Sequence, residues 1–220
     1  MISGKIKAPA PVIRRLSNYY HLLMGLRQRQ IQRISSTALA EMVEYNPVQV
    51  RKDLQLTGLV GKPKTGFLID EMEDAIRRFM GWELEFQAVL FGVGNLGSAL
   101  LRYPWREEHG LRFIAAFDSD PARCNILVNN IPVYHTDYFP TFSGEHEIHI
   151  GIVAVPAGEA QKVADLLIKE GIKGIWNFSH AHLKTPAHAT VENAIFTQSL
   201  AILTRRLVES QVTGSGKESS

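Results

Sequence analysis

Three glycines with the spacing of a dinucleotide-binding loop are the residues of this sequence best placed to do chemistry. Residues 86–91 form an apolar run typical of a buried strand, and a segment typical of a helix begins at Ser98. Between them lies the loop Gly92-Val93-Gly94-Asn95-Leu96-Gly97. In such a loop the glycines allow a tight turn, backbone approach to a pyrophosphate and close helix–strand packing, while the helix N-terminus offers N–H groups to the phosphates. The pattern predicts that this loop binds a dinucleotide.

An aspartate at the end of the next predicted strand indicates which dinucleotide is bound. Residues 111–117 form that strand, and Asp118 follows it. A carboxylate in this position accepts hydrogen bonds from the ribose hydroxyls of an adenosine and repels a ribose 2′-phosphate. We therefore expect NAD and NADH as cofactors rather than NADP. The alternative is that Asp118 only terminates the strand before Ser119-Asp120-Pro121.

Two later predicted strands end in residues that could complete the site. Pro156 and Ala157 follow one of them, and Asn177, Phe178 and Ser179 end the other. The carboxyl ends of parallel strands meet at the edge of the sheet where ligands bind, so these residues are expected to line the nicotinamide half. No metal is expected, because the histidines of residues 180–188 lack partners at zinc-like spacing.

The first 80 residues differ from the rest of the chain in charge. Residues 1–80 carry a net charge of +6, and residues 81–220 carry −4. Within the basic part, apolar spacing predicts a helix after Pro11, a second capped near Ser35 and a third capped by Asn46 with Pro47 in its first turn. A basic front on an acidic body indicates an anionic partner for the front, and nucleic acid is the usual candidate.

The three helices are followed by a turn-rich segment, residues 57–67, with the pattern of a hairpin or wing. Three helices and a basic hairpin are typical of a winged helix-turn-helix, whose third helix enters the major groove. The expected DNA-binding residues are Ser35, Ser36, Gln49, Arg51, Lys52, Lys62 and Lys64. A helical module used only for dimerisation is the alternative.

From residue 85 onward, short strands alternate with helices, which predicts a parallel α/β sheet. The predicted strands are Gln87–Phe91, Arg112–Phe117, His149–Val155 and Gly174–Phe178. We thus expect an α/β protein with a winged helix-turn-helix domain at 1–80, a connecting helix at 68–82, a Rossmann-like NAD(H)-binding domain at 81–195, a helix at 196–211 and a disordered tail at 212–220.

The chain has 220 residues, of which 45% are hydrophobic and 21% charged, a balance typical of a chain that buries a core. The uncharged, mostly apolar stretch at residues 88–101 contains three glycines and is too short to span a membrane. No signal peptide is expected, because residues 1–7 lack an apolar core, and no internal disulfide is expected, because Cys124 is the single cysteine. These features favour the cytoplasm, with Cys124 as a packing residue in a helix.

Taken together, the motifs resemble those of the Rex family of redox-sensing transcriptional repressors over about residues 9–208. The resemblance is carried by Arg15-Leu16 with Tyr19-Tyr20, Ser35-Ser36 with Leu39, Val50-Arg51-Lys52-Asp53, Gly58 with Gly61-Lys62, the glycine loop with Ala99-Leu100-Leu101 and Tyr103, residues 115–121, Val133-Tyr134, Val155-Pro156-Ala157, and residues 171–175 with Asn177-Phe178. It implies a homodimer with an exchanged C-terminal helix that binds palindromic operator DNA and is released by NADH.

By the same resemblance, Tyr103 would report the redox state of the cofactor. The chain departs from the family at three places. Its wing is poorer in tyrosine and glycine, and residues 54–57, after the third helix, lack the family's usual aromatics. At Ile195 the family has an aspartate that helps couple the nicotinamide to the DNA-binding domain. Phe196, Leu200, Leu203 and Leu207 still form an apolar face that needs a partner surface.

Two other functions are compatible with parts of the pattern. An NAD-dependent oxidoreductase with an accessory N-terminal domain would use the same glycine loop, but only about forty residues follow Phe178 and no Tyr-x-x-x-Lys or His–acid pair is evident. A regulator that binds another phosphate ligand, such as a coenzyme A derivative, is also possible. Asp118 favours NAD(H) over coenzyme A. Because no catalytic group for hydride transfer is evident, we expect a regulator and not an enzyme.

Overall fold

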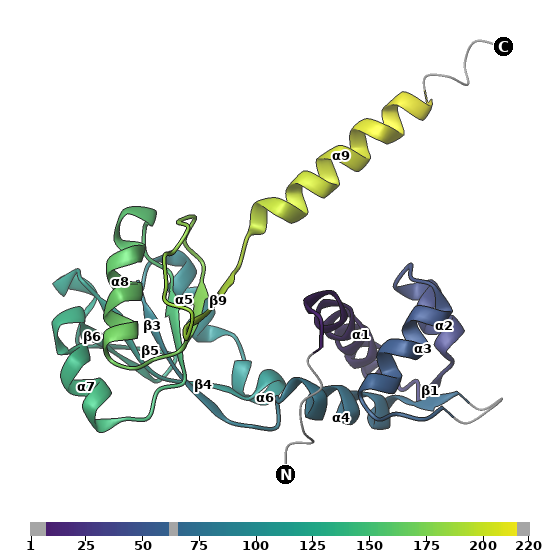
Figure 1. Ribbon diagram of the computed structural model, residues 1–220, viewed down its shortest axis with the longest axis horizontal. Helices are drawn as coiled ribbons and strands as arrows, with labels where there is room; N and C mark the ends of the chain where they lie inside the picture. Colours follow the sequence, from purple (N-terminus) through teal and green to yellow (C-terminus); the bar gives the residue numbers. More distant parts are fainter. Residues whose placement is uncertain (1–7, 62–65, 215–220) are drawn as a thin grey trace. The chain divides into compact units, whose positions relative to one another are not determined.

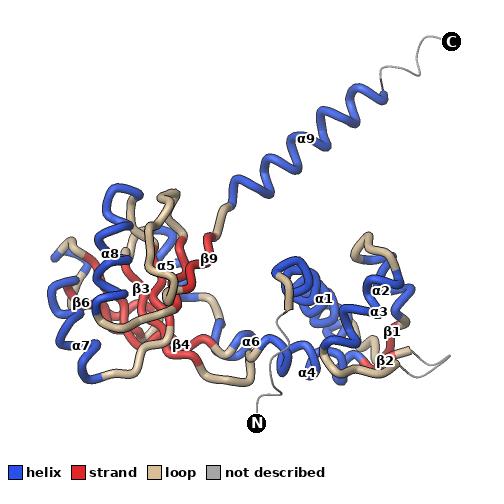
Figure 2. The backbone as a smooth tube through the Cα atoms, in the orientation of Figure 1, coloured by secondary structure: helices blue, strands red, loops and turns tan. Residues whose placement is uncertain are grey.

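A computed structural model describes residues 8–61 and 66–214, with side chains described up to residue 210. The chain forms two compact units. Unit 1 comprises Met1–Glu85 and Arg106–Gly110, and unit 2 comprises Phe86–Trp105 and Leu111–Ser220. Helices dominate unit 1 and the long strands lie in unit 2 (Figures 1 and 2). The chain therefore passes between the units three times, at residues 85–86, 105–106 and 110–111.

Unit 1 contains the three expected helices and a fourth. Its elements are α1 (Ala10–Gln28), β1 (Arg33–Ile34), α2 (Ser36–Met42), α3 (Pro47–Leu56), β2 (Phe67–Leu68) and α4 (Ile69–Met80). The Ser35 hydroxyl accepts a hydrogen bond from the Ala38 N–H at 3.0 Å, and the Asn46 side chain accepts one from the Val48 N–H at 2.8 Å. The local residue types therefore set the starts of α2 and α3.

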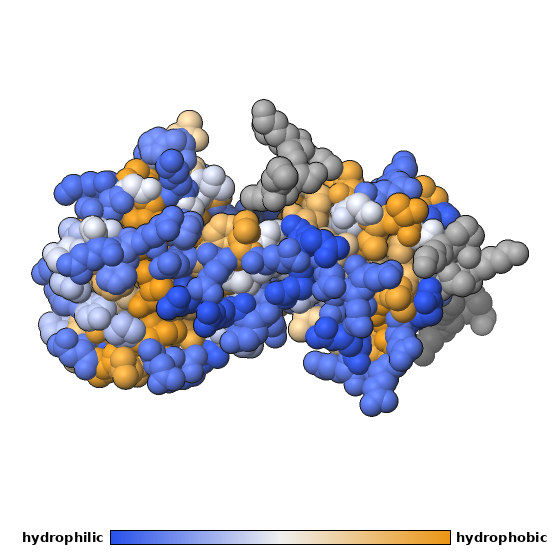
Figure 3. All heavy atoms as spheres, turned by 90° about the horizontal axis from the view of Figure 1, so that it is seen from below, coloured by the Kyte–Doolittle hydropathy of each residue, from blue (hydrophilic) through white to orange (hydrophobic). Residues whose placement is uncertain are grey.

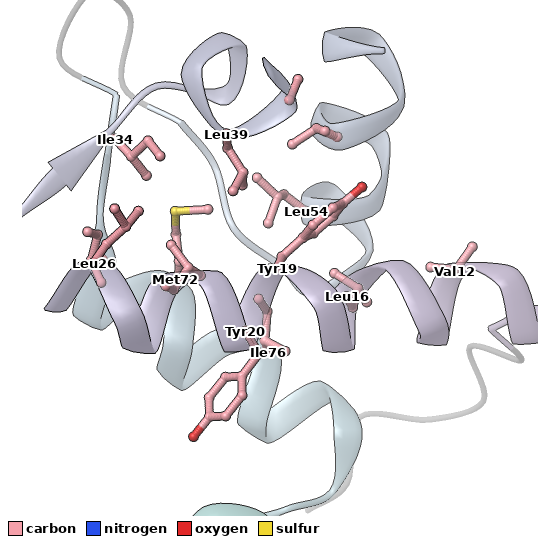
Figure 4. Packing of buried hydrophobic residues seen from close by; sticks show 14 residues of the cluster. Val12, Leu16, Tyr19, Tyr20, Leu26, Ile34, Leu39, Leu54, Met72 and Ile76 are labelled. Atoms are coloured by element: carbon pink, nitrogen blue, oxygen red, sulfur yellow. The ribbon is translucent and has the colours of Figure 1, made fainter. Parts of the chain in front are cut away.

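The helix predicted to connect the domains is part of the core of unit 1, so that prediction is wrong. Ile69, Met72 and Ile76 of α4 are at most 1% exposed, and they pack in one cluster with α1 and α3. Figure 4 shows Met72 and Ile76 beside Tyr19 and Tyr20 of α1. The apolar face of α4 is buried against its own domain, because a helix with such a face cannot bridge two domains in water without cost.

The predicted hairpin over residues 57–67 also differs from the structure. β2 pairs antiparallel with β1, with Ile34 opposite Phe67, and residues 57–61 form no strand. Lys62 and Lys64 lie outside the described residues. The partner strand of β2 is more than 30 residues earlier in the chain, and local turn signals do not reveal such pairing.

Unit 2 is a seven-stranded sheet with the order β5-β6-β4-β3-β7-β8-β9. Its strands are β3 (Phe86–Phe91), β4 (Leu111–Asp118), β5 (Ile126–Val128), β6 (Ile131–His135), β7 (Ile150–Val153), β8 (Gly174–Asn177) and β9 (Thr190–Asn193). All neighbours pair in parallel except β5 with β6. The four predicted strands are present, whereas β5, β6 and β9 were not predicted.

Helices cover both faces of this sheet. They are α5 (Asn95–Arg102), α7 (Phe139–Glu145) and α8 (Ala157–Lys169), with 3₁₀ turns at Pro121–Arg123 and Thr136–Tyr138. Two further helices do not cover the sheet: α6 (Trp105–His109) continues into unit 1 from Arg106, and α9 (Phe196–Gly214) follows the last strand. Val89 and Phe91 of β3 share one core with α7 and α8, and Ala88 and Leu90 share the other with α5. The alternation follows from the two-residue period of a strand.

The central strand β3 marks a change in chain direction across the sheet. The chain moves from β3 to β4 on one side and then returns to place β7 on the other side. In doubly wound sheets, the crevice for a ligand lies outside the carboxyl ends of the strands at such a point. The topology therefore places the candidate site next to Gly92 and Ala154.

The C-terminal helix α9 begins at Phe196 as predicted and continues to Gly214, so residues 212–214 of the expected disordered tail are helical. Its apolar residues Phe196, Leu200, Leu203 and Leu207 are 54–59% exposed. On the face drawn in Figure 3, hydrophobic areas alternate with hydrophilic residues. None of the helices in the described ranges has the length and apolar character needed to cross a membrane.

Candidate functional site

The glycine loop forms a tight passage from β3 into α5. Gly92 has φ of +95°, and a Cβ at this position would lie 2.5 Å from the Ala154 carbonyl oxygen. A Cβ on Gly97 would overlap the Gly92 carbonyl oxygen. Any side chain at either position would push the loop away from β7 or push α5 away from β3. The helix N-terminus is thus held close to the strand ends, where its N–H groups can meet an anion.

Asp118 joins the end of β4 to this loop. Its carboxylate is 6% exposed and accepts hydrogen bonds from the Val93 N–H at 2.7 Å and the Asp120 N–H at 2.9 Å. A carboxylate has about four acceptor positions, so further donors can still bind to it. Asp118 therefore does more than terminate the strand, because it orders the glycine loop and retains capacity for a ligand hydroxyl.

Arg123 brings a positive charge to the same place. Its Nη1 lies 3.6 Å from Asp118 Oδ2, and its Nε lies 3.6 Å from Asp120 Oδ2. The Nη1 atom is also 3.7 Å from the position of a Cβ on Gly94. The guanidinium thus lies beside the glycine loop. Arg123 was not predicted to line the site, because its position depends on the 3₁₀ turn after β4.

A cleft of about 680 Å³ opens at this edge of the sheet. Of the residues predicted to bind the cofactor, nine line it: Gly92, Gly94, Asn95, Leu96, Asp118, Pro156, Ala157, Phe178 and Ser179. Residues that were not predicted also line it, among them Ser119, Asp120, Arg123, Thr136, Val155, Glu159, Lys162 and His180. Most of these follow a strand directly or lie in the first turns of α8, so proximity to predicted strand ends could have identified them.

Four residues predicted to bind the cofactor do not line the cleft: Val93, Gly97, Tyr103 and Asn177. Val93 is buried, and Gly97 lies under the loop against Gly92. Tyr103 follows the last residue of α5, about 12 Å along the helix from the glycine loop. These positions shape the site or lie away from it, and sequence spacing alone does not separate the two.

Asn177 supports the cleft from behind. It is fully buried, and its amide nitrogen donates to the Ala181 carbonyl at 3.0 Å and to Asn193 Oδ1 at 2.8 Å. Its carbonyl oxygen accepts from the Ser179 N–H at 3.0 Å and the Ser179 hydroxyl at 2.6 Å. Asn177 therefore holds the loop that carries Ser179 and His180 into the cleft wall.

Other candidate chemistry finds little support in the described parts of the chain. No group of three or more metal-ligating side chains occurs there. Cys124 follows a 3₁₀ turn and is not in a helix as predicted, although it is buried. Its thiol contacts the Asp120 carbonyl at 3.3 Å, and burial raises its pKa. A thiol of this kind is a packing residue and not a ready nucleophile.

In unit 1, α3 presents a cationic face to solvent. Arg51 and Lys52 are exposed on it, and neither has an ion-pair partner among the residues described. Ser35 uses its hydroxyl as the cap of α2, and Ser36 is half-buried. Of the residues predicted to bind DNA, Arg51 and Lys52 are therefore the two with charged groups placed for phosphate or base contact.

Gln49 was predicted to contact DNA, but its side chain is bound to Asp53. Its amide nitrogen donates to Asp53 Oδ1 at 2.8 Å, within a network in which Arg15 donates to both Asp53 oxygens at 2.6 and 2.8 Å and the Tyr19 hydroxyl donates at 2.9 Å. Burial raises the pKa of Asp53, but the hydrogen bonds from Arg15, Gln49 and Tyr19 outweigh it and leave that pKa below its usual value. The network ties α3 to α1.

The comparisons with known proteins agree with this arrangement. A family model described as a CoA binding domain matches residues 85–181, and one described as the N-terminus of a putative DNA-binding protein matches residues 7–55. A redox-sensing transcriptional repressor Rex from Treponema denticola is 40% identical over 201 residues, 91% of this chain and 96% of that protein. Its counterpart from Bacteroides thetaiotaomicron is 34% identical over 91% of both chains.

Solved structures extend the comparison to the fold. A crystal structure of RSP, a Rex-family repressor, in complex with β-NADH matches with a TM-score of 0.86 at 30% identity, over 97% of this chain and 100% of that one. RSP in complex with β-NAD⁺ and operator DNA matches with a TM-score of 0.83 at 31% identity, over 98% and 100%.

A helix-turn-helix unit and a dinucleotide-type cleft in one chain define a ligand-responsive DNA-binding regulator. The relatives narrow this class, since they cover nine-tenths of the chain at 34–40% identity. The chain belongs to the Rex family of redox-sensing transcriptional repressors, which confirms the family predicted from its motifs.

Proposed function

We propose that this protein represses transcription by binding operator DNA when NADH is scarce and that NADH in the cleft releases it. The observation that carries the proposal is the presence, in one chain, of an exposed cationic α3 and a glycine-loop cleft closed by Asp118. Residues 1–80 would bind DNA, residues 81–195 the cofactor, and residues 196–211 a second copy of the chain. A location in the cytoplasm, where NADH and chromosomal DNA meet, belongs to this proposal.

The ligand is NADH, with NAD⁺ as its competitor for the same cleft. The glycine loop would hold the pyrophosphate, Asp118 the adenosine ribose, and Pro156, Ala157, Phe178 and Ser179 the nicotinamide half. The name of the matching family model, a CoA binding domain, keeps a coenzyme A derivative as the competing ligand. Asp118 favours NADH, since coenzyme A has a phosphate on its adenosine ribose that a carboxylate repels.

The DNA is expected to be a palindrome, bound by two copies of α3 in a homodimer. Arg51 and Lys52 would supply the contacts from the described residues, and Lys62 and Lys64 would add contacts from the wing. The exposed apolar face of α9 is the surface on which a second copy would pack. A Leu203→Glu variant should therefore sediment as a monomer, while the unchanged protein sediments as a dimer.

A regulator fits this chain better than an oxidoreductase. The relatives that cover nine-tenths of the chain are named transcriptional repressors. Unit 2 is a complete nucleotide-binding sheet followed by a single exposed helix, α9, and the described residues form no further domain to hold a substrate.

The test is fluorescence polarisation with a palindrome selected from random DNA, at one fixed salt concentration, because phosphate contacts make affinity depend on salt. Micromolar NADH should weaken binding by about 5–150-fold, and equal NAD⁺ should weaken it far less. By reciprocity, DNA should weaken NADH binding by the same factor. Coenzyme A should compete poorly with NADH. Tight DNA binding that ignores both nucleotides would contradict the ligand assignment, and absence of DNA binding would contradict the whole proposal.

A further inference from the structure

A row of five aromatic rings runs beside the cleft from the end of α5 to the start of α9. We call the aromatic row the set Tyr103, Trp105, Trp176, Phe178 and Phe196. Successive ring centroids are 4.3, 5.2, 4.6 and 6.0 Å apart. Ring pairs at about 4.5–7 Å attract one another beyond their burial. The row is therefore a packed chain of side chains and not a set of isolated rings.

One member of the row is part of the cleft wall. Phe178 lines the cleft, and only 8% of it is exposed. Its N–H donates to the Val153 carbonyl at 2.9 Å, which fixes its backbone to β7. A ligand that fills the cleft contacts Phe178, and Phe178 contacts Trp176 directly. Phe178 therefore links the cleft wall to the rest of the aromatic row by direct ring contact.

Trp105 is the member that leads into unit 1. Its indole nitrogen donates to the Leu100 carbonyl at 2.8 Å, so α5 holds its ring. It is also the first residue of α6, whose remaining residues, from Arg106, belong to unit 1. The covalent chain thus continues from Trp105 through α6 into unit 1.

Within unit 1, α6 is held by side chains of α1 and α4. Arg77 of α4 donates to the Glu108 carbonyl at 2.7 Å, the Glu107 carbonyl at 3.3 Å and the Tyr20 hydroxyl at 2.9 Å. The His109 ring packs edge-on against Trp82 at 4.7 Å and against Tyr20 at 6.3 Å. α6 is therefore fastened to the same helices whose core positions α3.

We propose that Trp105 is a positioning residue that transmits occupancy of the cleft to the DNA-binding unit through the aromatic row and α6. This inference rests on the proposed function, because it assigns a route to the coupling between NADH and DNA. Coupling between sites requires packed elements with two arrangements that the ligands favour unequally. Removing the ring of Trp105 should leave each binding site intact and weaken the coupling between them.

The experiment measures a coupling factor, the ratio of DNA dissociation constants with and without saturating NADH, for the full chain and its Trp105→Leu variant. The variant should bind NADH alone and DNA alone within about twofold of the unchanged protein, while the coupling factor falls at least about fivefold. Trp105→Phe, which keeps a ring in the row, should restore most of the coupling. A purely structural role would instead change the two binding affinities or the stability.

Tyr138→Leu is the matched control. Tyr138 has ring contacts with Tyr134 at 5.2 Å and Phe142 at 6.4 Å, and none of the three lines the cleft. Its loss should leave the coupling factor unchanged. An unchanged coupling factor in Trp105→Leu would overturn the inference, and so would an equal loss in Tyr138→Leu. If Trp105→Leu fails to fold, Arg77→Met replaces it as the test of the same route, with the same expected loss.

The response of the unchanged protein to NADH distinguishes an error in the route from an error in the proposed function. If NADH has no effect on DNA binding by the unchanged protein, the proposed function fails and the route with it. If NADH releases DNA from the unchanged protein and from both Trp105 variants alike, only the route through Trp105 is wrong.

Discussion

The two units of this protein each bury an aspartate, and they use it in opposite ways. Asp53 in unit 1 is 1% exposed and accepts four hydrogen bonds, all from side chains of α1 and α3. Asp118 in unit 2 is 6% exposed and accepts two, both from backbone N–H groups at the edge of an open cleft. The first carboxylate has its acceptor positions filled, and the second has positions left for a ligand.

The difference shows how to separate a structural buried charge from a functional one. A buried carboxylate surrounded by charged and neutral donors is stabilised by the fold alone, and its removal leaves those donors without a partner. A carboxylate that accepts from the backbone of a glycine loop beside a cleft has acceptor positions left and is placed to select a ligand. Substitutions at the two aspartates should therefore affect different measurements.

The largest effect is expected from Asp53→Ala. The change leaves the partly buried Arg15 without its ion pair and removes the acceptor of Tyr19 and Gln49, so unit 1 should lose about 3–5 kcal/mol of stability. Urea denaturation followed by circular dichroism measures this loss. Asp118→Asn is the comparison, since it leaves only one backbone N–H without its acceptor and should cost clearly less, and an equally large loss there would contradict the distinction between the two carboxylates.

A smaller, separate effect is expected from Asp118→Asn. It removes the charge that receives the ribose hydroxyls, and hydrogen bonds to charged groups are worth about 1.5–3 kcal/mol, so NADH affinity should fall at least about tenfold. Isothermal titration with NADH measures it. DNA affinity without NADH should stay within about twofold, and a matching loss of DNA binding would show that Asp118 is structural.

The DNA side should respond to Arg51→Ala and Lys52→Ala. Each removes an exposed cation of α3, so DNA affinity should fall about tenfold and the slope of log affinity against log salt should drop by about one. Polarisation over a series of salt concentrations gives both values. Arg78→Ala on α4 changes the charge equally, and if it weakens binding as much, α3 is not the recognition helix.

The smallest effect concerns the pH dependence of unit 1. Because the pKa of Asp53 is lowered on folding, its contribution is present above about pH 4, the value of an unfolded aspartate, and is lost as the pH falls through the folded pKa. Burial raises the pKa of Glu73, so its contribution has the opposite sign and declines as the pH rises. Denaturation between pH 3 and 8 should show Asp53→Ala costing less at the acid end and Glu73→Gln flattening the decline.

Local patterns predicted much of the fold. The starts of α2 and α3 follow from Ser35, Asn46 and Pro47, and the glycine loop follows a strand as its spacing requires. These features depend on residues a few positions apart, and short-range sterics and capping determine them. The strands β5, β6 and β9 were missed for different reasons, because β5 has three residues, β6 contains Pro132 and β9 is mostly polar.

Features that depend on distant residues were mispredicted or missed. The wing strand β2 pairs with β1, and α4 packs on α1 instead of connecting the domains. Gln49 was predicted to face DNA, yet its amide is bound by Asp53. Arg123 and His180 reach the cleft only because a 3₁₀ turn and the loop after β8 bring them there.

Residue types at short, fixed spacing were enough to predict the class of the protein, its family and the kind of ligand that its glycine loop binds. The tertiary structure alone decided which polar groups are used up inside the fold and which remain available to ligands. Burial and hydrogen-bond partners come from residues far apart in the chain. The sequence therefore does not distinguish Asp53, whose carboxylate accepts four hydrogen bonds, from Asp118, whose carboxylate lines a cleft.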